Sequence, residues 1–76
     1  MNNIHLNNLP MNKKGIVEKI NCDGNIRRRL LDLGVIKGTS IIPVLKGPFG
    51  DPIAYEIRGS LVALRKEISE LIEVNY

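Results

Sequence analysis

The chain has 76 residues, near the size at which one hydrophobic core is only just sufficient, so we expect a single domain over residues 1–76. Hydrophobic residues make up 43% of the chain, which excludes a disordered protein, and the aromatic ones are only Phe49, Tyr55 and Tyr76. The net charge of +3 is uneven, since residues 1–38 carry seven basic and three acidic side chains and the remainder carries four and five.

The first segment predicts a lead-in to the fold. Leu6 and Leu9 indicate an apolar strand or arm that covers one end of the core, and His5 lies in this amino-terminal arm. The β-branched segment from Gly15 to Ile20 is bounded by turn residues, which is typical of a strand. We therefore expect the first full strand at 15–20.

A helix with a glycine exit follows, within the stretch 25–38 (NIRRRLLDLGVIKG). Either Asp23 or Asn25 can supply the oxygen that caps its first turn. Gly34 is expected just past the end of the helix, where glycine enters the left-handed region without steric cost. The same motif would return Val35 against the helix.

The helical spacing predicts which residues of this helix face the core. Ile26, Leu30 and Leu33 fall within one narrow arc and are expected to close one end of the fold. Arg27 and Arg28 point away from that arc and are expected to face solvent.

The second half predicts strands and turns. Pro43 cannot donate to a sheet ladder, so at least part of its strand is expected to be an edge or a bulge. Ile53, Tyr55 and Ile57 alternate with polar residues and are expected to share a buried face. The predicted strands are 40–46, 53–58, 61–65 and 71–74, with a hairpin turn at Gly59-Ser60 and a helical turn at 66–70.

These elements predict an all-β fold with one short helix. A sheet of about five strands in so short a chain leaves an apolar face bare unless it curls. We therefore expect a small SH3-like β-barrel, with the helix between its first and second strands and covering one open end. Curling also removes the sheet edges.

The sequence offers little for catalysis, cofactors or metals. His5 is the only histidine and Cys22 the only cysteine, so no base accompanies the thiol and no pair has metal-ligand spacing. Cys22 is expected to be a half-buried core thiol, and a lone cysteine fits a reducing cytosol. We expect no enzyme activity, no cofactor and no metal site.

Two binding roles remain open. The arginines at 27–29 suit an RNA-binding SH3-like barrel, but such barrels usually expose aromatic residues for base stacking, and Tyr55 is expected to face the core. The other role is a protein-binding module. Phe49 lies in a loop rich in Gly and Pro, where it either anchors a partner or folds back over the barrel.

The sequence resembles the FeoA family of small SH3-like proteins of bacterial ferrous iron uptake. The resemblance covers about residues 6–74 and rests on four motifs in order. These are Leu6-x-x-Leu9 before Gly15, the stretch RLLDLGVIKGT at 29–39, Gly50-Asp51-Pro52, and Gly59 followed by LVALR at 61–65.

The resemblance implies a non-enzymatic cytoplasmic accessory protein that binds the cytosolic region of the iron transporter FeoB and modulates it. It then meets the membrane only through the transporter, and no nucleic acid is expected as a partner. The candidate contacts are Arg27, Arg28, Lys37 and Phe49. An edge strand around Pro43 leaves weak homo-oligomerisation open as well.

Overall fold

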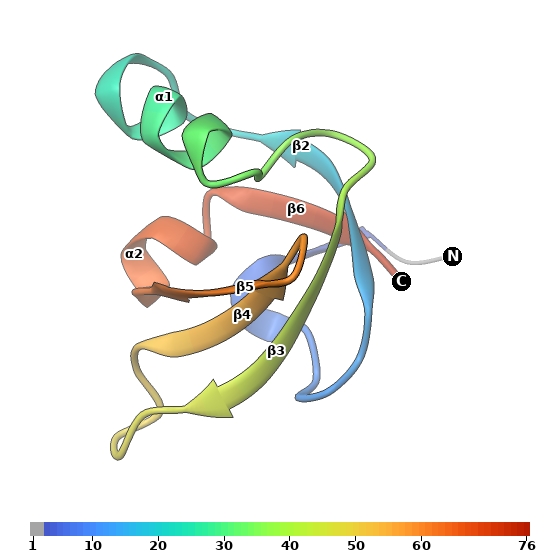
Figure 1. Ribbon diagram of the computed structural model, residues 1–76, viewed down its shortest axis with the longest axis vertical. Helices are drawn as coiled ribbons and strands as arrows, with labels where there is room; N and C mark the ends of the chain where they lie inside the picture. The colour runs from blue at the N-terminus through green and yellow to red at the C-terminus, as the bar shows by residue number, and fades with distance from the viewer. Residues whose placement is uncertain (1–2) are drawn as a thin grey trace.

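The computed structural model describes residues 3–76 and shows one curved antiparallel sheet with two short helices (Figure 1). Six strands run in the order β1-β6-β2-β3-β4-β5, so β1 and β5 are the end strands. The elements are β1 (Asn3–His5), a 3-10 turn (Leu6–Asn8), β2 (Gly15–Ile20), α1 (Gly24–Asp32), β3 (Ser40–Lys46), β4 (Ile53–Ile57), β5 (Ser60–Leu64), α2 (Lys66–Ser69) and β6 (Ile72–Asn75).

The predicted all-β class is confirmed, with the helix between the strands at 15–20 and 40–46. A sixth strand, β1, lies just before Leu6, whereas the strand or arm was expected at Leu6 and Leu9; both leucines are buried. His5 lies in β1, opposite Glu73. The sheet also keeps two free edges, whereas curling was expected to remove them.

Pro43 lies in the interior of the strand order, between β2 and β4. β2 pairs with β3 only at Gly15↔Ile41 and Ile16↔Ser40, so Pro43 has no β2 partner. On the other side the register with β4 shifts between Pro43 and Leu45. The predicted bulge is therefore confirmed, and it lies where the proline has no ladder bond to donate.

The β4–β5 hairpin turns one residue earlier than predicted. Its two central residues are Arg58 and Gly59, with φ of 51° and 84°, and Ile57 pairs with Ser60. Positive φ at both positions defines a type I′ turn, whose twist matches that of the strands. The sequence does not reveal that Arg58 enters the left-handed region, so it favours Gly59-Ser60 as the two turn residues.

The core is aliphatic around one tyrosine. Tyr55 and Ile57 are fully or almost fully buried, as the alternation in β4 predicted. Cys22 packs half-buried against this core, also as predicted. Within residues 3–76, neither helix is long and apolar enough to cross a bilayer.

Candidate partner-binding groove

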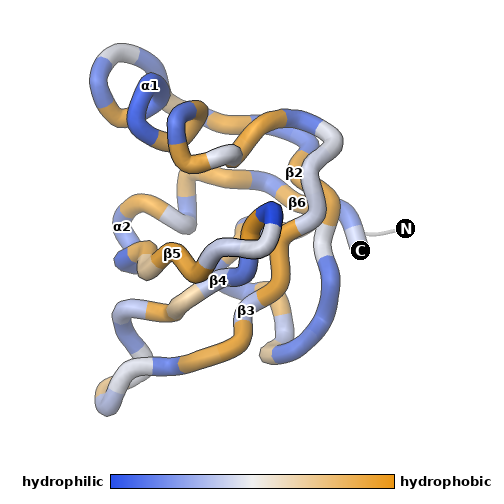
Figure 2. The backbone as a smooth tube through the Cα atoms, in the orientation of Figure 1, coloured by the Kyte–Doolittle hydropathy of each residue, from blue (hydrophilic) through white to orange (hydrophobic). Residues whose placement is uncertain are grey.

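A groove of about 420 Å³ lies between α1 and the end strand β5. Its floor and walls are mostly apolar, and three separate elements contribute to it. The apolar lining residues are Ile26 and Leu30 from α1, Leu33 at its C-cap, Val62, Ala63 and Leu64 from β5, and Ile68 from α2. Figure 2 shows hydrophobic segments on α1, β5 and α2.

The groove exists because α1 does not pack flat against the sheet. Leu30 is only 2% exposed, but Ile26 and Leu33 are 43% and 36% exposed. The prediction that all three close one end of the fold is therefore wrong for two of them. Helical spacing shows that they share a side of α1, but it does not say how close that side comes to the sheet.

The exit of α1 fixes the helix at one end. Val35 N–H donates to Leu30 O at 2.9 Å, and Gly34 N–H donates to Leu31 O at 3.0 Å. With Gly34 at φ 96°, these bonds form the predicted Schellman motif. Val35 is fully buried, so the exit turn is anchored in the core directly behind the groove.

The start of α1 is held differently from the prediction. Asp23 occupies the N-cap position but makes no side-chain cap hydrogen bond. Instead, the Arg27 guanidinium donates to the carbonyls of Ile20 and Cys22, at 3.2 and 3.4 Å. Arg27 therefore tethers the helix to the end of β2, a role that its position on the outer side did not reveal.

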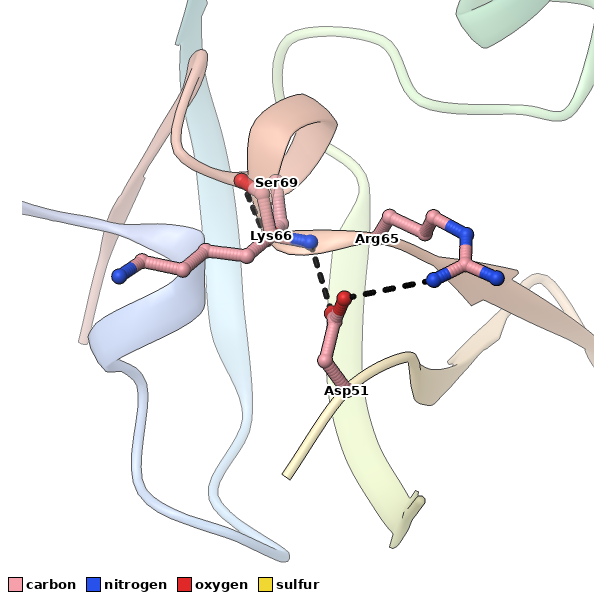
Figure 3. A network of polar contacts seen from close by, with 4 residues as sticks. All are labelled: Asp51, Arg65, Lys66 and Ser69. Carbon is pink, nitrogen blue, oxygen red and sulfur yellow. Dashed lines mark hydrogen bonds and ion pairs between the residues drawn. The ribbon is translucent and has the colours of Figure 1, made fainter. Parts of the chain in front are cut away.

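Charged side chains flank the apolar lining. Arg29 and Arg65 line the groove from opposite walls, together with the single acid Glu67. Arg65 lies 3.7 Å from Asp51 but remains largely exposed (Figure 3). The rim therefore has a net positive charge.

Asp51 supports the α2 wall of the groove. Its Oδ1 accepts the backbone N–H of Lys66, the first residue of α2, at 2.8 Å (Figure 3). This replaces a local cap, because the residue before α2 is an arginine without a capping oxygen. The sequence did not predict this contact, because Asp51 and Lys66 are 15 residues apart.

Ser69 of α2 and Tyr55 of β4 are two buried polar side chains. Ser69 is 1% exposed, and its hydroxyl donates to Lys66 O at 3.4 Å. Burial raises the pKa of the Tyr55 phenol, the Ser69 hydroxyl partly offsets this, and the Asp51 charge raises it further. Within residues 3–76, the Tyr55 hydroxyl makes no hydrogen bond of ordinary geometry.

The predicted contact residues occupy two separate regions. Arg27, Arg28 and Lys37 are exposed and surround Leu31 on the side of α1 away from the groove. We call these four residues the basic face. Phe49 is 97% exposed in the β3–β4 loop, at the opposite end of the molecule from α1 (Figure 1). It does not fold back over the sheet.

Among residues 3–76, no group of three or more His, Cys, Asp or Glu side chains is close enough to hold a metal ion. His5 lies in β1, whereas Cys22 lies between β2 and α1. The geometry instead offers an exposed apolar groove with a basic rim, which suits binding of another macromolecule.

The FeoA domain family matches residues 4–76 of this chain. A curated relative is a fusion of Fe(2+) transport protein A with the Fe(2+) transporter FeoB, from Porphyromonas gingivalis. It is 31% identical over 71 residues, which cover 93% of this chain. The chain spans only 8% of that relative's length.

Solved structures agree with the family match. A FeoA-like protein from Clostridium acetobutylicum is 36% identical with a TM-score of 0.87, covering 99% of this chain and 87% of that one. FeoA from Stenotrophomonas maltophilia, solved with zinc and described as an SH3 domain protein, is 32% identical. Its TM-score is 0.79, and the match covers 92% of this chain and 87% of that one. The predicted SH3-like fold is thereby confirmed.

Proposed function

Because the chain belongs to the FeoA domain family, we propose that it is a cytosolic, non-enzymatic accessory protein of ferrous iron uptake. In this proposal it binds the cytosolic region of a FeoB transporter through protein–protein contacts and modulates transport. The membrane is then met only through the transporter.

The observation that carries the proposal is the fused relative from Porphyromonas gingivalis. Fusion places the two parts of that protein at a high effective concentration, which favours even a weak contact between them. In a separate chain of this family, the same contact has to form between two proteins. The exposed groove supplies a surface for it.

We place the main contact in the groove, because its apolar walls combine with charges on the rim. Desolvated apolar surface provides most of the binding energy at such interfaces, while rim charges chiefly change the association rate. Arg28 and Lys37 on the basic face are proposed to steer an acidic partner. Arg27 contributes to this charge, and Phe49 is proposed as a second, separate contact.

The test is a titration of the FeoB cytosolic region with this protein, in the apo, GDP-bound and GTP-analogue-bound states. Ile26→Glu and Leu33→Glu place a charge in the groove at half-exposed positions that the fold tolerates. We expect each to weaken binding by about tenfold or more. Leu31→Glu is the charge-matched comparison, since Leu31 is 41% exposed but lies on the basic face, so we expect it to slow association without raising the dissociation rate.

Other outcomes are equally informative. Absence of binding in all three nucleotide states would overturn the proposed function. If Leu31→Glu and Arg28→Glu abolish binding while the groove variants bind normally, the basic face is the interface instead. Phe49→Ala separately tests the second contact and is expected to weaken binding by a few-fold, about 1 kcal/mol.

RNA binding makes a different prediction and is not favoured by the geometry. Base stacking would need an aromatic side chain beside the arginines. Tyr55 is buried, and the β3–β4 loop, which carries Phe49, lies at the far end of the molecule from α1. Retardation of an RNA at about 50 mM salt, lost steeply as salt rises, would reverse this judgement.

A further inference from the structure

One wall of the groove is the free edge of β5. Val62, Ala63 and Leu64 are consecutive in β5, yet all three line the groove, as does Arg65 directly after the strand. Successive side chains of a strand point to opposite faces, so one face alone would contribute every second residue. The groove therefore follows the edge of the strand, where backbone groups are accessible.

The hairpin geometry shows which backbone groups point outward. In a two-residue turn, the flanking pair Ile57↔Ser60 exchanges hydrogen bonds, and bonded and non-bonded pairs then alternate along the ladder. Val62 thus bonds to β4, whereas the N–H and C=O groups of Leu61 and Ala63 point away from it. Within residues 3–76, no loop, turn or side-chain hydrogen bond uses these outward groups.

We propose that the groove binds its partner as an added β-strand: an extended segment of another protein pairs with the outer edge of β5. This rests on the proposed function, which places the partner in the groove, and adds how the partner is recognised. Leu61 and Ala63 supply the main-chain hydrogen bonds, and α1 covers the added strand from the other side. Such strand addition draws affinity from the backbone and specificity from the pockets beside it.

The side chains around the edge define the chemistry of the segment. A strand exposes alternate residues to one side, so every second side chain of the guest enters the apolar lining formed by Ile26, Leu33 and Ile68. β5 has five residues, which matches an apolar core of about five guest residues. Arg29 and Arg65 on opposite walls outnumber the lining acid Glu67 and favour carboxylates at the ends of the guest.

A second copy of the chain is a poorer occupant. Antiparallel pairing of two β5 edges would place the strand sequence SLVAL in each groove, and this strand has no carboxylate to offer Arg29 or Arg65. An acidic guest strand would instead place carboxylates near these arginines. The rim charge therefore selects a different protein over self-association.

The experiment uses a nine-residue probe peptide in which valine and threonine alternate between paired glutamates at each end. Its matched control carries lysines in place of the glutamates. Amide exchange of the protein is followed by NMR with each peptide. We expect the acidic peptide to protect the Leu61 and Ala63 amides by about tenfold or more, with little change at Val62, which already bonds to β4.

Two variants separate backbone pairing from side-chain contact. Ala63→Pro removes an outward N–H without breaking the ladder to β4, and prolines are tolerated on strand edges. Ala63→Thr keeps the N–H and a strand-favouring side chain. We expect the proline variant to lose peptide binding by about tenfold or more and the threonine variant to keep it.

The outcomes distinguish failure of strand addition from failure of the proposed function. No protection at Leu61 and Ala63, equal binding of the lysine peptide, or full binding by Ala63→Pro would overturn strand addition. So would concentration-dependent dimerisation that protects the same amides without any peptide. If the peptide binds as expected but the FeoB cytosolic region does not bind, strand addition stands and the proposed function fails.

Discussion

Replacement of Leu30 by alanine tests whether one side chain holds α1 to the body of the protein. Leu30 is 2% exposed and is the only buried residue of α1. Leu→Ala removes the equivalent of about three methylene groups, at roughly 0.8 kcal/mol each, and a cavity adds to this. Because the groove beside Leu30 opens to solvent, water can occupy the vacated space. We therefore expect a loss near 3 kcal/mol, in the lower half of the roughly 2–5 kcal/mol range.

The loss is large for a chain of this length. At roughly 0.05–0.15 kcal/mol per residue, the free energy of unfolding is about 4–11 kcal/mol. With a urea m-value of about 1 kcal/mol/M, Leu30→Ala should lower the unfolding midpoint by roughly 3 M. The measurement is urea unfolding followed by far-UV circular dichroism.

Leu31→Ala is the matched control for this prediction. Leu31 is the next residue of the same helix but is 41% exposed, and alanine favours helix formation. We expect it to cost less than about 1 kcal/mol. Equal midpoint shifts for the two variants would refute the reasoning, because the attachment of α1 would then not depend on the buried side chain.

Three further substitutions test the supports around the groove. Gly34→Ala puts a side chain at φ 96° with its Cβ 3.0 Å from Arg58 Cδ, whereas Gly38→Ala has a similar φ and no atom within 4 Å. Backbone strain should lower the free energy of unfolding by about 1–2 kcal/mol in both variants, and more at Gly34. Urea unfolding measures both losses. Asp51→Ala removes the cap on α2 and should cost about 1 kcal/mol, while Asp51→Asn keeps an acceptor and should cost less. Burial raises the pKa of Tyr55 above 10.0, so the folded state holds the phenol proton more tightly than the unfolded chain does. That contribution to stability is complete below the unfolded pKa and is lost as pH rises toward the folded value. The drop in urea midpoint from about pH 8 to about pH 11 should therefore be smaller for Tyr55→Phe than for the unchanged protein.

Local signals in the sequence predicted much of the fold. The Schellman exit at Gly34 depends on residues within one turn of each other, and the alternation around Tyr55 depends on one strand alone. The bulge at Pro43 follows from a missing N–H, a property of the residue itself. Each was predictable because its cause lies within a few residues of its effect.

The groove could not be predicted in the same way, because its shape depends on how far α1 stands from β5. Ile26 and Leu33 have the spacing of core residues, and the pattern is identical whether that side is covered by the sheet or by a partner. The cap that Asp51 provides for α2 depends on two segments meeting in space. The edge of β5 likewise becomes visible only once the strand order is known.

These differences change the interpretation of the motif at residues 29–39. Leu30, Gly34 and Val35 in it make the exit turn and bury it, so they determine where α1 leaves the sheet. The opening between α1 and β5 follows from that departure, which makes the buried residues responsible for the existence of the groove. Arg29 and Leu33, from the same motif, line the opening and meet whatever enters it. Substitutions at the buried residues should therefore reduce stability and binding together. Substitutions at Arg29 and Leu33 should change binding alone. Urea unfolding and binding titration of the same variants distinguish the two cases.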